Sequence, residues 1–355
     1  LGGPVWIPRV HHGKDRTFFF VSYAGSRKRG ATDTAAVQIP NPANLAGDFS
    51  NLLDNRGALR RIYDPATTRP DAQLGFVRDP FPGNRVPRDR FDPVTAKIAG
   101  FLPAPNAAGT LNYRGQIGEI VLDPDTFVLK LDHSFAAQHR VGGSFNTTKI
   151  PRLLIRSPLP PPLPSDASDQ IIKGYTARLT YDYVIRPTLL NQLTLGYNLF
   201  DHNNLTVTKR VYPSKTGSWP EELGLKGVSG TAFPVVTFTG GYAGFASTTG
   251  TSDDEQLYVL KDGVSWFTGQ HSLKLGAEVR VTRSNLRSTG NMSGSFAFSD
   301  LGTALPSQVA NTGNAFASFL LGDVQSGSMN FPSIREPRRP YVGFYLQDDL
   351  KLTSR

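Results

Sequence analysis

The segment QLYVLKDGVSWF-TGQ-HSLKLGAEVRVTR, residues 256–283, decides the fold that we predict for this chain. Every second residue of His271–Arg283 is apolar, namely Leu273, Leu275, Ala277, Val279 and Val281. The residues between them are Lys274, Gly276, Glu278, Arg280 and Thr282. Such alternation is typical of a β-strand with one apolar and one charged face. The preceding run, Gln256–Phe267, is a strand of ambiguous register, and Thr268–Gln270 joins the two as a hairpin.

The same pattern occurs at two earlier positions of the chain. These hairpins comprise Phe127–Phe135, Ala136–His139 and Arg140–Thr147, and Tyr175–Tyr183, Ile185–Thr188 and Leu190–Phe200. Further strands are predicted at Arg16–Gly25 and Tyr341–Leu352. Short turns at one end of a sheet and long Gly- and Pro-rich loops at the other are typical of a barrel that crosses a membrane. We therefore predict an all-β fold, a partial transmembrane antiparallel β-barrel with long extracellular loops and short periplasmic turns.

Alternation alone also fits a soluble sheet that buries its apolar face. Two features favour the barrel. The predicted strands are longer than the five or six residues common in soluble sheets. Aromatic residues also gather near the strand ends, as an interfacial girdle requires, at Phe18, Phe19, Phe20, Tyr23, Tyr181, Tyr183, Trp266, Phe267, Phe344 and Tyr345.

Composition limits the classes of function open to the chain. Hydrophobic residues make up 39% of the 355 positions, and no apolar run approaches the roughly 20 residues that a membrane helix needs. With no cysteine, disulfides and thiolate metal sites are absent. The net charge of +9 could attract nucleic acid or lipid phosphates. Because Lys and Arg are spread along the chain, we interpret it as scattered solubilising charge and expect no nucleic-acid partner.

Two short helices are predicted within the connections between strands. Ser26–Asp125 shows little periodicity and is predicted to be a long extracellular loop folded over the barrel mouth. Within it, Asp92-Pro93 would cap a helix at Asp92–Phe101. Asn314–Leu321 is predicted to be a helix that ends at Gly322 and packs a loop down. Residues 1–15 are predicted to be loop-like.

No constellation of residues indicates catalysis or a cofactor. His11 and His12 are adjacent and would point apart in an extended chain, so a metal site there is improbable. The acidic run Asp253-Asp254-Glu255 and the pair Asp348-Asp349 could hold Ca²⁺, but solvated strand ends explain them better. Neither a nucleophile elbow nor a phosphate-binding glycine loop is found. We expect a protein without catalytic residues, cofactor or metal, and not an enzyme.

Nine sequence motifs in a fixed order resemble those of a known family. They are GGP (2–4) before KDRTFFF (14–20), GDFS (47–50), IYDP (62–65), PFPGNRVP (80–87) before RFDPV (90–94), GQHSLKLG (269–276), FLLG (319–322) and GFYLQDDLKLT (343–353). Their order resembles the barrel of TonB-dependent outer-membrane transporters, in particular the Oar-like receptors with a carboxypeptidase-regulatory-like N-terminal domain. The match spans nearly the whole chain.

The resemblance implies a plugged barrel of about 22 strands in the bacterial cell outer membrane, driven by an inner-membrane TonB complex. Residues 1–15 would be the junction from the plug domain, and residues 16–355 would hold roughly the first eight strands, with 26–125 as a long loop. No TonB box, plug or C-terminal aromatic strand is seen, so we expect an internal segment of a longer protein.

The function expected from these observations is import of a scarce extracellular solute. Its partners would be outer-membrane lipid, the TonB complex, the plug domain and an extracellular ligand. Ligand contacts are expected from the loops Ser26–Asp125 and Asp201–Thr251. The candidate lumen-facing charges are Lys130, Asp132, Arg178, Asp182, Lys274, Glu278 and Arg280, which would guide the ligand, hold the plug or hydrate the lumen. The alternatives are an outer-membrane barrel with an adhesive or assembly role, and a soluble extracellular β-rich binding module.

Overall fold

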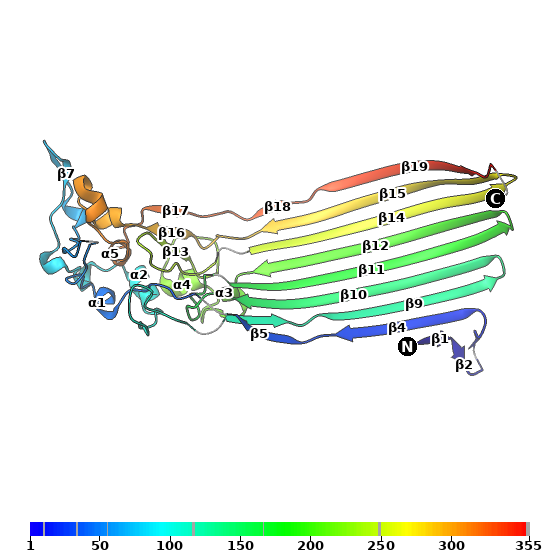
Figure 1. Cartoon of the computed structure of the whole chain (residues 1–355), viewed down its shortest axis with the longest axis horizontal. Helices are drawn as coiled ribbons and strands as arrows, with labels where there is room; N and C mark the ends of the chain where they lie inside the picture. The colour runs from blue at the N-terminus through cyan, green and yellow to red at the C-terminus, as the bar shows by residue number, and fades with distance from the viewer. Residues whose placement is uncertain are drawn as a thin grey trace.

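The computed structural model describes residues 1–9, 11–32, 35–54, 56–115, 118–165, 167–247 and 250–352. Parts of the predicted loops Ser26–Asp125 and Asp201–Thr251, and the last three residues of the predicted barrel segment 16–355, lie outside this range. The described residues form one large curved sheet and a folded cluster of loops at one end of it (Figure 1). No helix among them has the length and apolar character needed to cross a membrane.

The sheet contains twelve strands within the described ranges, and its long strands follow one another in chain order with antiparallel pairing. The long strands are β4 (Thr17–Gly25), β9 (Asp125–Ala136), β10 (His139–Ile155), β11 (Ala167–Arg186), β12 (Leu189–Leu205), β14 (Gly250–Thr268), β15 (His271–Ser288) and β19 (Arg338–Leu350). Short strands extend the same sheet, namely β1 (Gly2–Pro4), β5 (Lys28–Thr32), β8 (Gly118–Leu122) and β18 (Ser333–Arg335).

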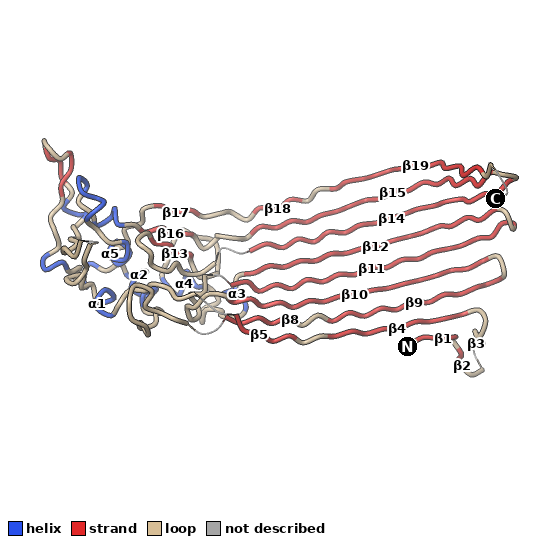
Figure 2. The backbone as a smooth tube through the Cα atoms, in the orientation of Figure 1, coloured by secondary structure: helices blue, strands red, loops and turns tan. Residues whose placement is uncertain are grey.

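The three predicted hairpins are confirmed as β9–β10, β11–β12 and β14–β15. Their short turns lie together at one end of the sheet, and the long connections lie at the other (Figure 2). The strands are longer than predicted: β11 has 20 residues and begins at Ala167, where the prediction began at Tyr175. The prediction stopped where the apolar alternation ends, whereas the backbone ladder continues because its hydrogen bonds do not depend on side-chain polarity.

The prediction that residues 1–15 are loop-like was wrong in part. β1 pairs with β4, so that Gly2 lies opposite Phe20. β2 (Trp6–Ile7) and β3 (His11–His12) form a separate two-stranded sheet. Sequence alternation could not reveal strands of two or three residues, because they are too short to show a period.

The long connections fold together into a compact unit, which we call the loop domain (35–54, 56–115, 156–165, 206–247 and 289–332). Ser26–Asp125 is therefore not a structureless loop. The helices of the described chain lie in this unit or at its junction with the sheet (Figure 2): α1 (Pro42–Leu45), α2 (Pro93–Ala99), α3 (Val207–Arg210), α4 (Trp219–Leu223), α5 (Ala315–Leu320), and the 3-10 turns η1 (Pro65–Thr67), η2 (Pro82–Asn84), η3 (Arg88–Arg90), η4 (Asp300–Thr303) and η5 (Pro306–Asn311). Its strands are β6 (Arg69–Asp71), β7 (Gly75–Val77), β13 (Val235–Phe238), β16 (Ser295–Phe298) and β17 (Ser326–Ser328).

A core rich in aromatic side chains holds the loop domain together. Fully buried members from different connections include Phe49, Ile62, Phe233, Phe245, Phe316 and Phe319. Burying each such side chain contributes about 1.5–3 kcal/mol relative to leaving it exposed. Because these residues come from three separate connections, the core forms only when the connections meet.

Both predicted helices are confirmed, the first with its predicted cap at Asp92 and the second with a cap at Asn314 that was not predicted. The Asp92 carboxylate accepts hydrogen bonds from the Val94 and Thr95 amides at 3.0 and 2.9 Å, and α2 follows it. The Asn314 side chain likewise accepts from Phe316 and Ala317, and all of α5 is buried. α5 thus packs the connections down, as predicted.

Several of the quoted sequence motifs meet inside the loop domain. The Asn84 amide nitrogen donates to the Phe49 carbonyl at 2.6 Å, and its oxygen accepts from the Ile62 amide at 2.8 Å. The motifs PFPGNRVP, GDFS and IYDP are thereby joined through one buried side chain. Gly47 is required where it stands, because its φ is +83° and a Cβ would lie 2.4 Å from the Val86 carbonyl oxygen.

One ion pair makes the loop domain sensitive to acid. Arg90 donates to both carboxylate oxygens of Asp64, at 2.7 and 3.0 Å, and these hydrogen bonds hold the pKa of Asp64 below its ordinary value. A carboxylate whose pKa is lowered by folding adds stability above its unfolded pKa of about 4, and that stability is lost as pH falls through the folded pKa.

We therefore expect the loop domain to lose protection from proteolysis as pH is lowered below about 4. Asp64→Asn should lower protection at neutral pH and flatten this pH dependence. Asp89→Asn is the matched control, because the Asp89 carboxylate makes no hydrogen bond within the described part of the chain. An unchanged pH profile in Asp64→Asn would contradict the assignment.

Candidate functional site

The register of the sheet divides its side chains between two faces, because residues directly opposite one another point to the same side. Two adjacent rows of one face are Leu131, Gly143, Leu179, Leu195, Leu260, Val279 and Val342, and Leu129, Phe145, Ala177, Tyr197, Tyr258, Val281 and Pro340. We call this the apolar face. Leu179, Leu195 and Leu260 are 46, 43 and 45% exposed, so the described chain does not cover it.

All seven candidate charges predicted from the sequence lie on the opposite, polar face. One of its rows is Lys130, Ser144, Arg178, Gly196, Val259 and Arg280. The adjacent row is Asp132, Gly142, Thr180, Thr194, Lys261 and Glu278. Asp182 and Lys274 lie on the same face nearer the short turns. The structure thus brings together charges from three hairpins.

Lys261 and Arg140 are charged residues of the polar face that the sequence prediction missed. Lys261 lies directly opposite Glu278, and Arg140 lies directly opposite Asp182. Lys261 was missed because the register of Gln256–Phe267 looked ambiguous. The short turn that pairs Thr268 with His271 was the signal that could have fixed it.

The middle of the polar face, from the row of Lys130 to that of Asp182 and Lys274, presents an excess of positive charge. Its three carboxylates in these rows are all partnered: Arg140 binds Asp132 at 3.1 Å, Arg280 binds Glu278, and the Gln192 amide donates to Asp182 at 2.7 Å. By contrast, Lys130, Arg178 and Lys274 have no ion-pair partner among the described residues. Exposed cations gathered on one face attract anions.

The acidic runs do not come together as a metal site. Asp253 and Asp254 point to opposite faces, as do Asp348 and Asp349. The Asp348 carboxylate is instead 2.7 Å from Nδ1 of His271. Within the described ranges, no group of three His, Cys, Asp or Glu side chains could hold a metal ion.

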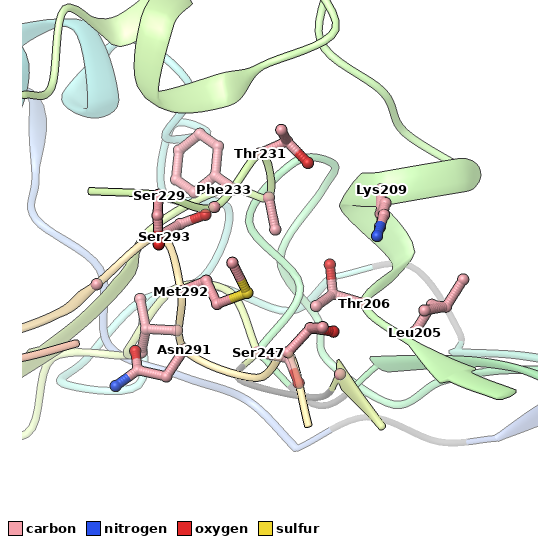
Figure 3. Close-up of a pocket in the computed structure, with 16 residues that line it drawn as sticks. Leu205, Thr206, Lys209, Ser229, Thr231, Phe233, Ser247, Asn291, Met292 and Ser293 are labelled. Atoms are coloured by element: carbon pink, nitrogen blue, oxygen red, sulfur yellow. The ribbon is translucent and has the colours of Figure 1, made fainter. Parts of the chain in front are cut away.

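A second feature is a cavity of about 220 Å³ where the loop domain meets the ends of β12, β14 and β15 (Figure 3). Lys209 reaches it from α3 on one side and Met292 from residues 289–294 on the other. The lining residues are Leu205, Thr206, Lys209, Ser229, Gly230, Thr231, Ala232, Phe233, Val235, Ser247, Gly250, Thr289, Asn291, Met292, Ser293 and Gly294. Many belong to the predicted ligand-contact loop Asp201–Thr251, and none belongs to Ser26–Asp125.

Backbone hydrogen bonds fix the walls of this cavity. The Ser229 and Gly230 amides donate to the Met292 carbonyl at 3.2 and 2.9 Å. The Thr289 amide donates to the Gly250 carbonyl at 2.7 Å. β13 and β16 pair in parallel beside it. Segments 229–235, 250 and 289–294 are thus held together without help from their polar side chains.

Two buried polar atoms of the cavity wall lack a partner in the described part of the chain. They are Oδ1 of Asn291 and Oγ of Ser293. The Asn291 amide nitrogen is used, since it donates to Ser328 Oγ at 3.1 Å. An unsatisfied buried acceptor costs about 1–3 kcal/mol. Because both atoms are sealed from solvent, they face protein and not the cavity, and the candidate binding site rests on the cavity itself and on Lys209 in its wall.

Comparison with known proteins identifies the architecture. A family model described as "Outer membrane beta barrel domain" matches residues 1–355. The outer membrane transporter YddB from Escherichia coli is similar in structure, with a TM-score of 0.43 and 10% sequence identity over 94% of this chain and 31% of that chain. The chain therefore spans less than a third of the length of that solved protein. No curated protein matches the sequence.

Proposed function

The chain belongs to the outer membrane β-barrel family, and from this we propose that it is part of a TonB-dependent transporter that imports an extracellular solute and catalyses no reaction. It is located in the outer membrane. On this proposal the apolar face contacts lipid, the polar face lines a water-filled lumen, the loop domain lies outside the cell and the short turns lie in the periplasm. The Oar-like motifs support the TonB-dependent assignment.

The observation that carries the proposal is that charged side chains lie on one face of the sheet and apolar side chains on the other. An adhesive barrel needs no unpaired cations along its lumen, whereas a transporter that guides a solute uses them. Lys130, Arg178 and Lys274 lie on one face, and the rows behind them are apolar. The predicted partners, the TonB complex and a plug domain, would complete the transporter.

The proposal is tested by comparing two deletions in the native host. Cells that lack the gene and cells that lack TonB are fed the same mixture of labelled extracellular solutes, and the intracellular pool is measured by mass spectrometry. We expect the same solute to be lost in both strains. If neither deletion lowered the uptake of any solute, and the cells that lack the gene attached less well to surfaces instead, the adhesive alternative would be favoured.

Removing the unpaired cations should slow import of that solute if it is an anion. We expect Lys130→Gln combined with Arg178→Gln to reduce uptake several-fold at low salt, and less at high salt, because screening acts over about 10 Å at 0.1 M. Lys226→Gln, an exposed lysine of the loop domain, is the control. Equal uptake by both variants would contradict a guiding role for the polar face.

A further inference from the structure

The side of the sheet that carries the apolar face also carries charged residues, distributed unequally between its two ends. Toward the short turns, the long strands place Asp262, Asp348 and Arg186 on this side. Toward the loop domain, they place there the cations Lys149, Lys173, Arg283, Arg287 and Arg338 and the carboxylates Asp125, Asp169, Asp201 and Asp254. We call this second set the outer belt.

Ion pairing leaves the outer belt with a surplus of cations. Three of its carboxylates are neutralised, because Asp125 binds Arg27 at 2.8 Å, Asp201 binds Lys173 at 3.1 Å and Asp169 binds Arg210. The exposed cations that have no ion-pair partner in the described part of the chain are Lys149, Arg283, Arg287 and Arg338. The charge that looked scattered in the sequence is thus gathered at one end of the sheet.

Two of these cations lie directly opposite each other. Arg283 of β15 pairs with Arg338 of β19 in the ladder. The Cβ atoms of such a pair are about 4.5–5.5 Å apart, and like charges directly opposite destabilise a sheet. An anion between the two guanidinium groups would remove this repulsion.

The height of Arg283 in the sheet indicates where that anion would come from. On β14, the rise from Trp266 near the short turns to Gln256, which lies opposite Arg283, is about 25 Å at 3.3 Å per residue and a tilt of about 40°. This equals the height of about 25 Å of the apolar band of outer-membrane barrels. Arg283 therefore lies level with the outer lipid head groups when the apolar face contacts lipid.

The Arg283 side chain extends toward the lipid and away from the nearest carboxylate. Its guanidinium carbon lies 5.5 Å from the centre of the ring of Tyr258, which belongs to the apolar face. Asp254 lies one row nearer the loop domain, where it accepts a hydrogen bond from the Gln256 amide at 3.5 Å. Glu336, in the gap between β18 and β19, makes no ion pair with a described residue.

We propose that Arg283 and Arg338 bind a phosphate group of the phosphorylated glycolipid in the outer leaflet of the membrane. This site presupposes the lipid contact of the apolar face given in the proposed function, and extends that function by the identity of the lipid. Guanidinium groups suit phosphate because they donate two parallel hydrogen bonds to its oxygens.

Arg287 provides a second contact for the same head group. It lies on the same side and strand as Arg283, about 13 Å away at 3.3 Å per residue. Lipid A, the membrane anchor of such a glycolipid, carries a phosphate at each end of a disaccharide. Two separated positive positions therefore suit it better than a phospholipid with a single phosphate.

The first test measures the glycolipid that copurifies with the full-length protein from host outer membranes, by mass spectrometry. We expect Arg283→Gln combined with Arg338→Gln to lower the retained glycolipid about tenfold, since charged hydrogen bonds are lost. Arg339→Gln is the matched control, because Arg339 adjoins Arg338 but points to the polar face opposite Thr282. It should retain as much glycolipid as the parent protein.

The second test adds defined lipids to the delipidated protein in detergent. We expect lipid A with two phosphates to bind about tenfold more tightly than phosphatidylglycerol, and Arg287→Gln to reduce this preference. Equal retention by the double variant and Arg339→Gln, or equally tight binding of phosphatidylglycerol or inorganic phosphate, would overturn the proposed site. Glycolipid binding without TonB-dependent uptake would contradict only the transport function, and uptake without glycolipid binding would contradict only the lipid site.

Discussion

Leu195→Arg is expected to destabilise the sheet in a lipid bilayer by about 2–4 kcal/mol, the cost of a charged side chain on a lipid-facing strand near mid-depth. Leu195 lies in the apolar face between Leu179 and Leu260 and is 43% exposed. The nearest carboxylate on the same face is Asp262, diagonal to Leu195 on β14, and it already accepts a hydrogen bond from the Asn191 side chain at 2.7 Å. The measurement is urea-induced unfolding of the protein in lipid vesicles.

Asn198→Arg is the matched control for that prediction, because Asn198 lies on the same strand and points to the polar face between Thr176 and Leu257. We expect its effect to stay within about 0.5 kcal/mol, since water would solvate the new charge. Equal stability of the two variants would contradict the assignment of the faces, and a larger loss in Asn198→Arg would reverse it.

Phe319→Ala is expected to destabilise the loop domain by about 3–5 kcal/mol, the usual cost of deleting a buried phenylalanine. Phe319 is fully buried, and its ring packs against Phe298, Phe316 and Phe238 with centroids 5.1, 5.3 and 5.4 Å away. Hydrogen exchange should quicken across 35–115 and 290–330 and remain slow in the middle of the long strands.

Phe331→Ala provides the comparison, because Phe331 is 75% exposed. We expect no measurable change in exchange for this variant. Loss of protection in the long strands of Phe319→Ala would show that the sheet and the loop domain unfold as one unit, and would contradict this prediction.

The sequence was sufficient for the hairpins and for the two faces, because both are local. In His271–Arg283 the alternation of apolar and polar residues shows which face each side chain occupies. A turn of two or three residues then determines which strands pair. The same locality explains why the seven predicted charges came out on one face. It also explains the predicted cap at Asp92, where the deciding hydrogen bonds span two or three residues.

The loop domain and its cavity could not be predicted in this way. Asn84 connects Phe49 and Ile62, and the Met292 carbonyl accepts a hydrogen bond from the Ser229 amide. These partners are far apart in the sequence, so no periodic pattern of residues reveals that they meet. Short strands such as β13 and β16 pair only because two separate connections meet in the loop domain. Their residues carry no alternation long enough to detect.

The unusual length of the strands has a spatial consequence. The 20 residues of β11 extend about 66 Å along the strand at 3.3 Å per residue. Tilted by about 40°, they rise about 50 Å, whereas the hydrocarbon layer is about 30 Å thick. On the proposed orientation, the loop domain extends beyond the lipid head groups, where antibodies, phage tail fibres and soluble proteases can reach it in intact cells.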